Sequence, residues 1–98
     1  MAKYEFEAPV WKWPGMAAWH FVTVDAEVAV RIREDRAGAP RVGWGSIPVS
    51  VTVGKTTWKT SIFPDKKSGS YLLPMKAEVR KKEGISAGDT ISVSFTLQ

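Results

Sequence analysis

The basic residues of this chain are concentrated in one stretch, where the chemistry they could perform is anion binding. Residues 55–82 contain eight Lys and Arg against two Asp and Glu, whereas residues 1–54 contain six of each kind. The net charge of +4 therefore arises from one segment. Long-range attraction to an anionic partner is one interpretation of this excess, and simple solubility of a small domain is the other.

Within this stretch, Lys76 and Arg80 are the candidate anion-binding pair. They are four positions apart in a predicted helix and would share one face of it. A guanidinium binds carboxylate or phosphate through two parallel hydrogen bonds, which makes Arg80 the stronger candidate. Lys59, on a preceding predicted strand, extends the basic face. Arg80 could equally pair with Asp89 or Glu83 and stabilise the fold.

Five tryptophans in 98 residues are a second source of binding chemistry. Trp44 is flanked by two glycines, which let a ligand or another backbone approach closely, so it is the candidate stacking residue. Trp11 and Trp13 would share one face of a strand. Tryptophan also fills cores, because each ring buries on the order of 200 Å². Core filling is therefore the competing interpretation for all of these rings.

The chain lacks the residue combinations that catalysis and metal binding require. It has no Cys and a single His, His20, so neither a thiolate nucleophile nor a zinc ligand set is expected. No paired carboxylates and no nucleophile beside a base occur at suggestive spacing. We expect a protein without catalytic residues, metal or cofactor, with His20 in a structural or half-exposed role. The absence of Cys suits the cytoplasm, and no apolar run is long enough to span a membrane.

Period-two alternation of apolar and polar residues predicts a β-rich fold. The predicted strands cover residues 4–10, 19–24, 47–53, 57–63, 70–75 and 91–97. Residues 76–83 predict a short helix, because they follow Pro74 and stop at Gly84, a suitable left-handed residue. Residues 25–36 predict a second helix, with Asp25 as its N-cap. Pro48 requires a strand start, an edge or a bulge, so residues 43–48 are expected to be kinked.

Two segments recur along the chain and indicate an internal duplication. Residues 26–28, Ala-Glu-Val, return at 77–79, and the strand at 47–53 returns at 91–97. The chain then divides into two copies of strand, strand, helix, strand. These copies could close about a pseudo-twofold axis into a small barrel. The predicted fold is mainly β: one domain over residues 1–98, with about six strands in a closed or pseudo-closed barrel and two short capping helices. Such a fused pair is expected to be monomeric. Chance similarity between Val-, Ser- and Thr-rich strands is the alternative.

The chain also resembles a known family, the domain of unknown function 1905. The residues that carry the resemblance are Trp19 to Val22, Gly43-Trp44-Gly45, Val49 to Val53, Trp58 to Ser61, Pro64, Gly69, Leu73-Pro74, Lys76, Val79 to Lys81 and Gly88-Asp89. The resemblance implies a small β-barrel with short capping helices, of the double-split type. Transition-state regulators and antitoxins that bind DNA as dimers share that type, but a shared fold is an analogy and not evidence of DNA binding.

These observations lead to two functional hypotheses. The first is a non-enzymatic binding module whose basic face around Lys59, Lys76 and Arg80 meets an anionic partner, with nucleic acid as the first candidate. The second is a small-molecule binder, or a subunit of a larger assembly, that uses the Trp-rich face including Trp44. No membrane partner is expected under either hypothesis.

Overall fold

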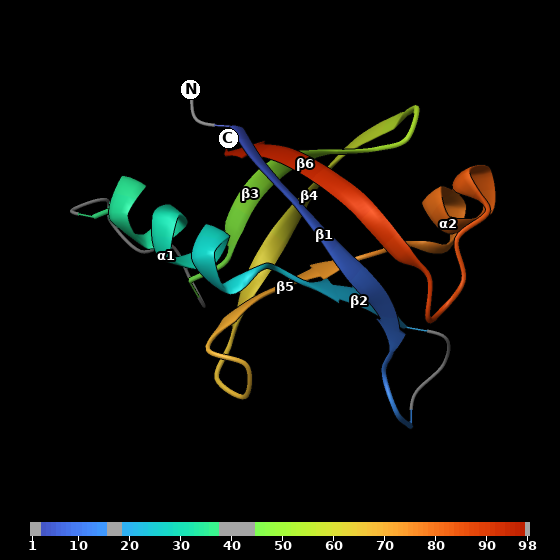
Figure 1. Ribbon diagram of the computed structural model, residues 1–98, viewed down its shortest axis with the longest axis horizontal. Coiled ribbons are helices and arrows are strands. Elements are labelled where there is room, and N and C mark those ends of the chain that lie inside the picture. The colour runs from blue at the N-terminus through green and yellow to red at the C-terminus, as the bar shows by residue number, and fades with distance from the viewer. Residues whose placement is uncertain (1–2, 16–18, 38–44, 98) are drawn as a thin grey trace.

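The computed structural model describes residues 3–15, 19–37 and 45–97, which form eight elements (Figure 1). All six predicted strands and both predicted helices are confirmed to within a few residues. Trp44 and Gly43 lie outside the described residues. The elements are β1 (Lys3–Lys12), β2 (His20–Thr23), α1 (Ala26–Asp35), β3 (Ile47–Val53), β4 (Thr56–Asp65), β5 (Ser70–Pro74), α2 (Ala77–Glu83) and β6 (Thr90–Leu97).

The strands form a closed antiparallel barrel, as predicted, and their order around it is β1-β2-β5-β4-β3-β6. The barrel closes because its two longest strands change partners along their length. β1 pairs with β6 as far as Pro9 and with β2 from Val10 onward. β4 pairs with β3 as far as Ile62 and with β5 from Phe63 onward. Each long strand is therefore shared by two sheets: β1-β6-β3-β4 and β1-β2-β5-β4.

Four prolines lie in strands, each at a position with a partner on one side only. Pro9 pairs with β6 before the β2 ladder begins, and Pro64 pairs with β5 after the β3 ladder has ended. Pro48 pairs with β4 one residue before the β6 ladder begins, and Pro74 ends β5 paired with β2 alone. A proline has no backbone N–H, so these half-paired positions tolerate it. For this reason β4 continues through Pro64 to Asp65, two residues beyond the strand predicted at 57–63.

The predicted duplication is visible in the register of the strands. Val22 of β2 faces Leu73 of β5, and the two residues lie 51 positions apart. Val51 of β3 faces Phe95 of β6, and these lie 44 positions apart. These are the two offsets at which the sequence segments recur. A residue can face its own counterpart only where a twofold axis crosses the ladder, so a pseudo-twofold axis runs through both pairs.

The same relation holds for the backbone where each half turns from its second strand into its helix. The Val24 N–H donates to the Tyr71 carbonyl, and the Met75 N–H donates to the His20 carbonyl, both at 2.9 Å. Val24 corresponds to Met75 and His20 to Tyr71 at the offset of 51. The two halves therefore hold each other by reciprocal bonds beside the axis.

The helices begin and end as their sequences predict, and they lie on opposite sides of the barrel (Figure 1). The Asp25 carboxylate caps α1 by accepting from the N–H groups of Glu27 and Val28, at 3.1 and 3.4 Å. α2 ends at Gly84, which has a left-handed φ of 65°. Both helices bury apolar residues against the barrel core, namely Val28, Ala29 and Ile32 of α1 and Val79 of α2.

Each helix is also tied by a carboxylate to the first strand of its own half. The Tyr4 hydroxyl of β1 donates to Asp35, the last residue of α1. The Thr56 hydroxyl of β4 donates to Glu83 of α2 at 2.6 Å, and Glu83 also accepts from the Lys55 N–H at 3.3 Å. These bonds fix the C-terminal end of each helix over the barrel.

The contact between Glu83 and the β3–β4 turn generates a stability prediction. Gly54 has φ of 59°, and a Cβ placed there would lie 2.0 Å from Glu83 Oε1. Gly54→Ala should cost about 1 kcal/mol for the left-handed backbone, plus about 1 kcal/mol for the displaced hydrogen bonds. Gly69→Ala is the control, because its φ of 72° is similar and an added Cβ there would have no atom within 4 Å apart from its chain neighbours. Urea unfolding should show the larger loss for Gly54→Ala, and the excess should vanish in a Glu83→Ala background. Equal losses in the wild-type background would contradict the role of Glu83.

A second prediction concerns alkaline pH. Burial above all, and then the hydrogen bond to Asp35 and its charge, raise the pKa of Tyr4 from 10.0 to about 12. Because the folded state holds the Tyr4 proton more tightly, this stabilisation is complete below pH 10 and is lost as the pH rises toward 12. Lysines also titrate in this range, so the measurement is the difference in unfolding free energy between wild type and Tyr4→Phe. That difference should shrink from pH 9 to pH 12, and a constant difference would refute the assignment.

Candidate binding site

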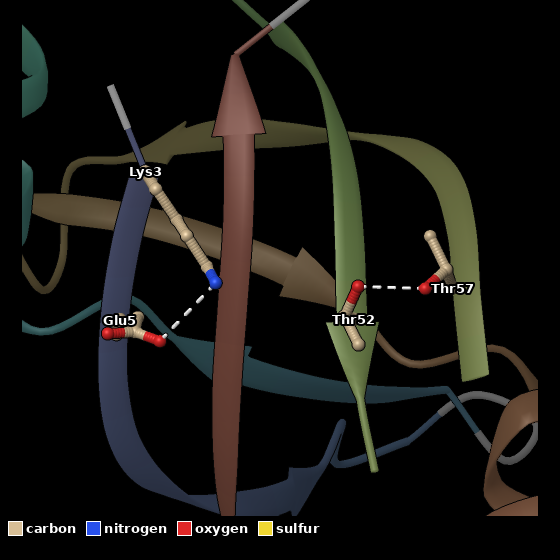
Figure 2. Close-up of polar contacts among 4 residues, drawn as sticks. All are labelled: Lys3, Glu5, Thr52 and Thr57. Carbon is tan, nitrogen blue, oxygen red and sulfur yellow. Dashed lines mark hydrogen bonds and ion pairs between the residues drawn. The ribbon is translucent and has the colours of Figure 1, made fainter. Parts of the chain in front are cut away.

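The barrel presents two outer faces of different chemistry, and the sheet β1-β6-β3-β4 carries the polar one. Its cross-strand neighbours include Lys3, Thr96, Ser50 and Lys59, in that order across the four strands. Figure 2 shows the face around β6, with an ion pair between Lys3 and Glu5 at 3.7 Å. A groove of about 460 Å³ follows this face, lined by Glu5, Phe6, Glu7, Thr52, Gly54, Ser92, Val93 and Ser94.

The polar groups of this face bond to one another and their charges cancel. Thr52 and Thr57 share a hydrogen bond of 2.8 Å between their hydroxyls (Figure 2), and the Ser92 hydroxyl donates to Glu7 at 3.2 Å. Lys59 is exposed here, on the outside of β4, in the same cross-strand row as Lys3. The structure therefore places Lys59 on a face that also carries two glutamates.

The sheet β1-β2-β5-β4 carries an aromatic cluster on its outside, formed by the first hairpin. Its rings form a chain of contacts: Trp11 to Phe21 at 5.3 Å between centroids, Trp11 to Trp13 at 6.0 Å, and Trp19 to Phe21 at 6.0 Å. Trp13 also meets Phe21 edge-on at 5.9 Å. Aromatic pairs favour separations of about 4.5–7 Å and such tilted geometries. We call Trp11, Trp13, Trp19 and Phe21 the aromatic cluster.

The cluster has a fixed base and an open top. Phe21 is buried, and the Trp11 indole N–H donates to the Thr23 hydroxyl at 3.0 Å. The backbone N–H of Trp13 donates to the backbone carbonyl of Trp19 at 2.8 Å, and this bond extends the hairpin beyond the strands. Trp13 and Trp19 nevertheless stay 45% and 58% exposed. Core filling is therefore the wrong interpretation for these two rings.

Two basic residues lie close in the backbone to the hairpin that carries the cluster. Lys12 lies between two ring-bearing residues and pairs with His20, which is half-buried. Its side chain alternates with those of Trp11 and Trp13, so it leaves β1 on the other face of the strand end. The His20 carbonyl accepts from the Met75 N–H, so the next residue, Lys76, begins α2 beside the strand that carries Phe21. Lys12 and Lys76 are both exposed, and the sequence did not predict that the backbone of Lys76 adjoins the end of β2.

Arg80, the candidate anion ligand, also bonds to the backbone at the start of α2. Its Nε donates to the Met75 carbonyl at 3.0 Å, and the residue is half-buried. This bond fixes the corner between β5 and α2 and hence the position of Lys76. The acidic partners considered for Arg80 both bond to backbone N–H groups: Glu83 to Lys55 and Asp89 to Ser86.

Comparison with known proteins identifies the family of this chain. The family model described as Domain of unknown function (DUF1905) matches residues 6–95. The chain belongs to this family. The match spans all but the first residues of β1 and the last residues of β6, includes the aromatic cluster and Lys76, and confirms the resemblance seen in the sequence. A search among curated proteins found no match.

Two features, a metal site and a membrane-spanning helix, are absent from the residues that the structure describes. No group of three or more His, Cys, Asp or Glu side chains there is arranged to hold a metal ion. Neither of the two helices has the length and apolar character needed to cross a membrane.

The exposure of the cluster predicts that its outer rings contribute little to folding. Trp13→Ala and Trp19→Ala should each lower the free energy of unfolding by no more than about 1 kcal/mol, because much of each ring is already in water. Trp58→Ala, at a core position only 8% exposed, should cost about 3–5 kcal/mol. Urea unfolding followed by circular dichroism would measure all three. A loss above 3 kcal/mol for either outer ring would mean that the ring serves the fold.

Proposed function

We propose that this DUF1905 protein is a non-enzymatic binding module for nucleic acid, which it holds through the aromatic cluster and the lysines beside it. One observation supports this function above others: two exposed tryptophans stand on a fixed aromatic base, and exposed Lys12 and Lys76 lie on the adjoining backbone. Flat rings bind bases, and adjacent cations bind the phosphates between them. Nucleic acid is the partner that offers both groups at regular spacing.

The electrostatics of the region favour this partner. Neither Lys12 nor Lys76 forms an ion pair with another described residue, whereas Lys82 pairs with Glu78 at 3.6 Å and Lys3 with Glu5. The charges of Lys12 and Lys76 are therefore directed to solvent, where a phosphate can reach them. Arg80 acts as a positioning residue in this proposal, because its bond to the Met75 carbonyl fixes the start of α2.

The proposal replaces the single basic face expected from the sequence with a smaller site. Lys59 is left out, since it lies on the polar face, in the cross-strand row that begins at Lys3. Lys59 is useful as a control for Lys12 and Lys76. It has the same charge and a similar exposure, but it is remote from the aromatic cluster in the pairing order of the strands.

The test is the salt dependence of binding. Anisotropy of a labelled 12-nucleotide single strand should show an affinity that falls steeply between about 50 and 200 mM salt, because counterions are released from phosphates. Lys12→Ala and Lys76→Ala should each reduce the slope of log affinity against log salt by about 0.7, the value for one phosphate contact on a single strand. Lys59→Ala should leave the slope unchanged.

Two results would contradict the proposal. One is the absence of binding at 50 mM salt, and the other is an equal effect of all three lysine substitutions, which would indicate diffuse attraction without a site. A protein interface is the rival function, favoured by the same exposed tryptophans. Under that function Trp13→Ala would abolish self-association or partner association in size-exclusion experiments, while oligonucleotides would not bind.

A further inference from the structure

We infer that the ligand of this site is a single strand, with its bases stacked on Trp13 and Trp19, and that each chain binds one such strand. This inference rests on the proposed function and narrows it. It follows from a difference between the two halves of the barrel. The halves share their backbone but differ at the positions that make up the site.

The strand register gives the pseudo-twofold counterpart of each site residue. Trp11 pairs with Phe21 as Phe63 pairs with Leu72, since Phe21 and Leu72 are related by the offset of 51. The positions beyond this pair follow in order along both hairpins. The counterparts are Phe63 for Trp11, Pro64 for Lys12, Asp65 for Trp13, Ser70 for Trp19, Leu72 for Phe21 and Asp25 for Lys76.

The counterpart positions serve the fold. The Asp65 carboxylate accepts from the Ser68 N–H at 3.1 Å and shapes the β4–β5 turn. The Ser70 hydroxyl donates to the Val24 carbonyl at 2.6 Å and is buried. Asp25 caps α1. The symmetry-related region of the barrel therefore lacks both exposed rings, and it presents carboxylates where the site presents Trp13 and Lys76.

This asymmetry opposes recognition of a duplex across the pseudo-twofold axis. A reader of a symmetric duplex needs equivalent contacts from both halves, as dimeric DNA-binding proteins have. Here Asp25 and Asp65 would face the phosphates that the other half attracts. A duplex also keeps its bases stacked on each other, so it offers no base to Trp13 or Trp19. A single strand can place splayed bases on the rings and needs only one of the two symmetry-related regions.

The experiment compares three probes of equal length. A 12-nucleotide single strand should bind at least about tenfold more tightly than the same sequence in a duplex. It should also bind at least about fivefold more tightly than an abasic 12-mer, which keeps the phosphates but has no base to stack. Trp13→Ala and Trp19→Ala should each weaken single-strand binding by about fivefold or more and leave abasic binding within twofold. Native mass spectrometry should show one strand per chain.

Phe63→Ala is the matched control, because Phe63 is the exposed aromatic residue at the related position of the second half. It should change single-strand affinity by less than twofold. The inference is overturned if the duplex or the abasic strand binds as tightly as the single strand, if Phe63→Ala matches Trp13→Ala, or if two strands bind per chain. Salt-dependent binding that still requires Lys76 would in those cases leave the proposed function in place. Absence of binding to every probe would remove both.

Discussion

The structure depends on one constraint, the closure of six strands so that no edge remains unpaired. An open edge would expose a row of backbone hydrogen-bonding groups. Closure is achieved with few residues because β1 and β4 each serve two sheets in succession. The reciprocal bonds of Val24 and Met75 then lock the halves together where the chain turns into each helix. Both helices are thereby directed to the sides of the barrel, and each is fastened by a carboxylate to the long strand of its own half.

Closure also determines what each side chain can do. The interior of so small a barrel accepts few large rings, and one cross-strand row supplies three of them: Tyr4, Phe95 and Trp58, with Val51 between the last two. Tyr4 and Trp58 occupy related positions on either side of the axis. The other inward positions near the axis hold Val and Leu side chains, such as Val22 and Leu73. The three tryptophans of the first hairpin lie outside the barrel, where they form part of its surface and not of its core.

Much of this architecture could be predicted from the sequence, because local signals and the repeat agreed. Asp25 and Gly84 marked the helix ends, and the two offsets of the repeat match the register that closes the barrel. The site was harder to predict. Period-two alternation puts Trp11 in the set of Glu5 and Glu7, opposite Val10, and so marks it as outward. Because a tryptophan is more commonly a core residue, this signal did not lead to a predicted surface cluster. The position of Lys59 on the polar face depends on the strand pairing of the barrel, which composition does not contain.

The two halves solve the same structural problem with different residues, and the difference shows where function is free to act. Asp25 and Lys76 begin equivalent helices, yet only Asp25 provides a side-chain cap. A missing cap costs about 1 kcal/mol, and a cation at a helix N-terminus is also unfavourable to the helix dipole. Similarly, Trp13 and Trp19 expose apolar surface to water, whereas their counterparts Asp65 and Ser70 do not. Each of these choices is unfavourable for the fold alone, and all of them meet at one rim of the barrel. A ligand with flat rings and negative charge would offset them together, and this convergence distinguishes a binding site from a chance collection of exposed residues.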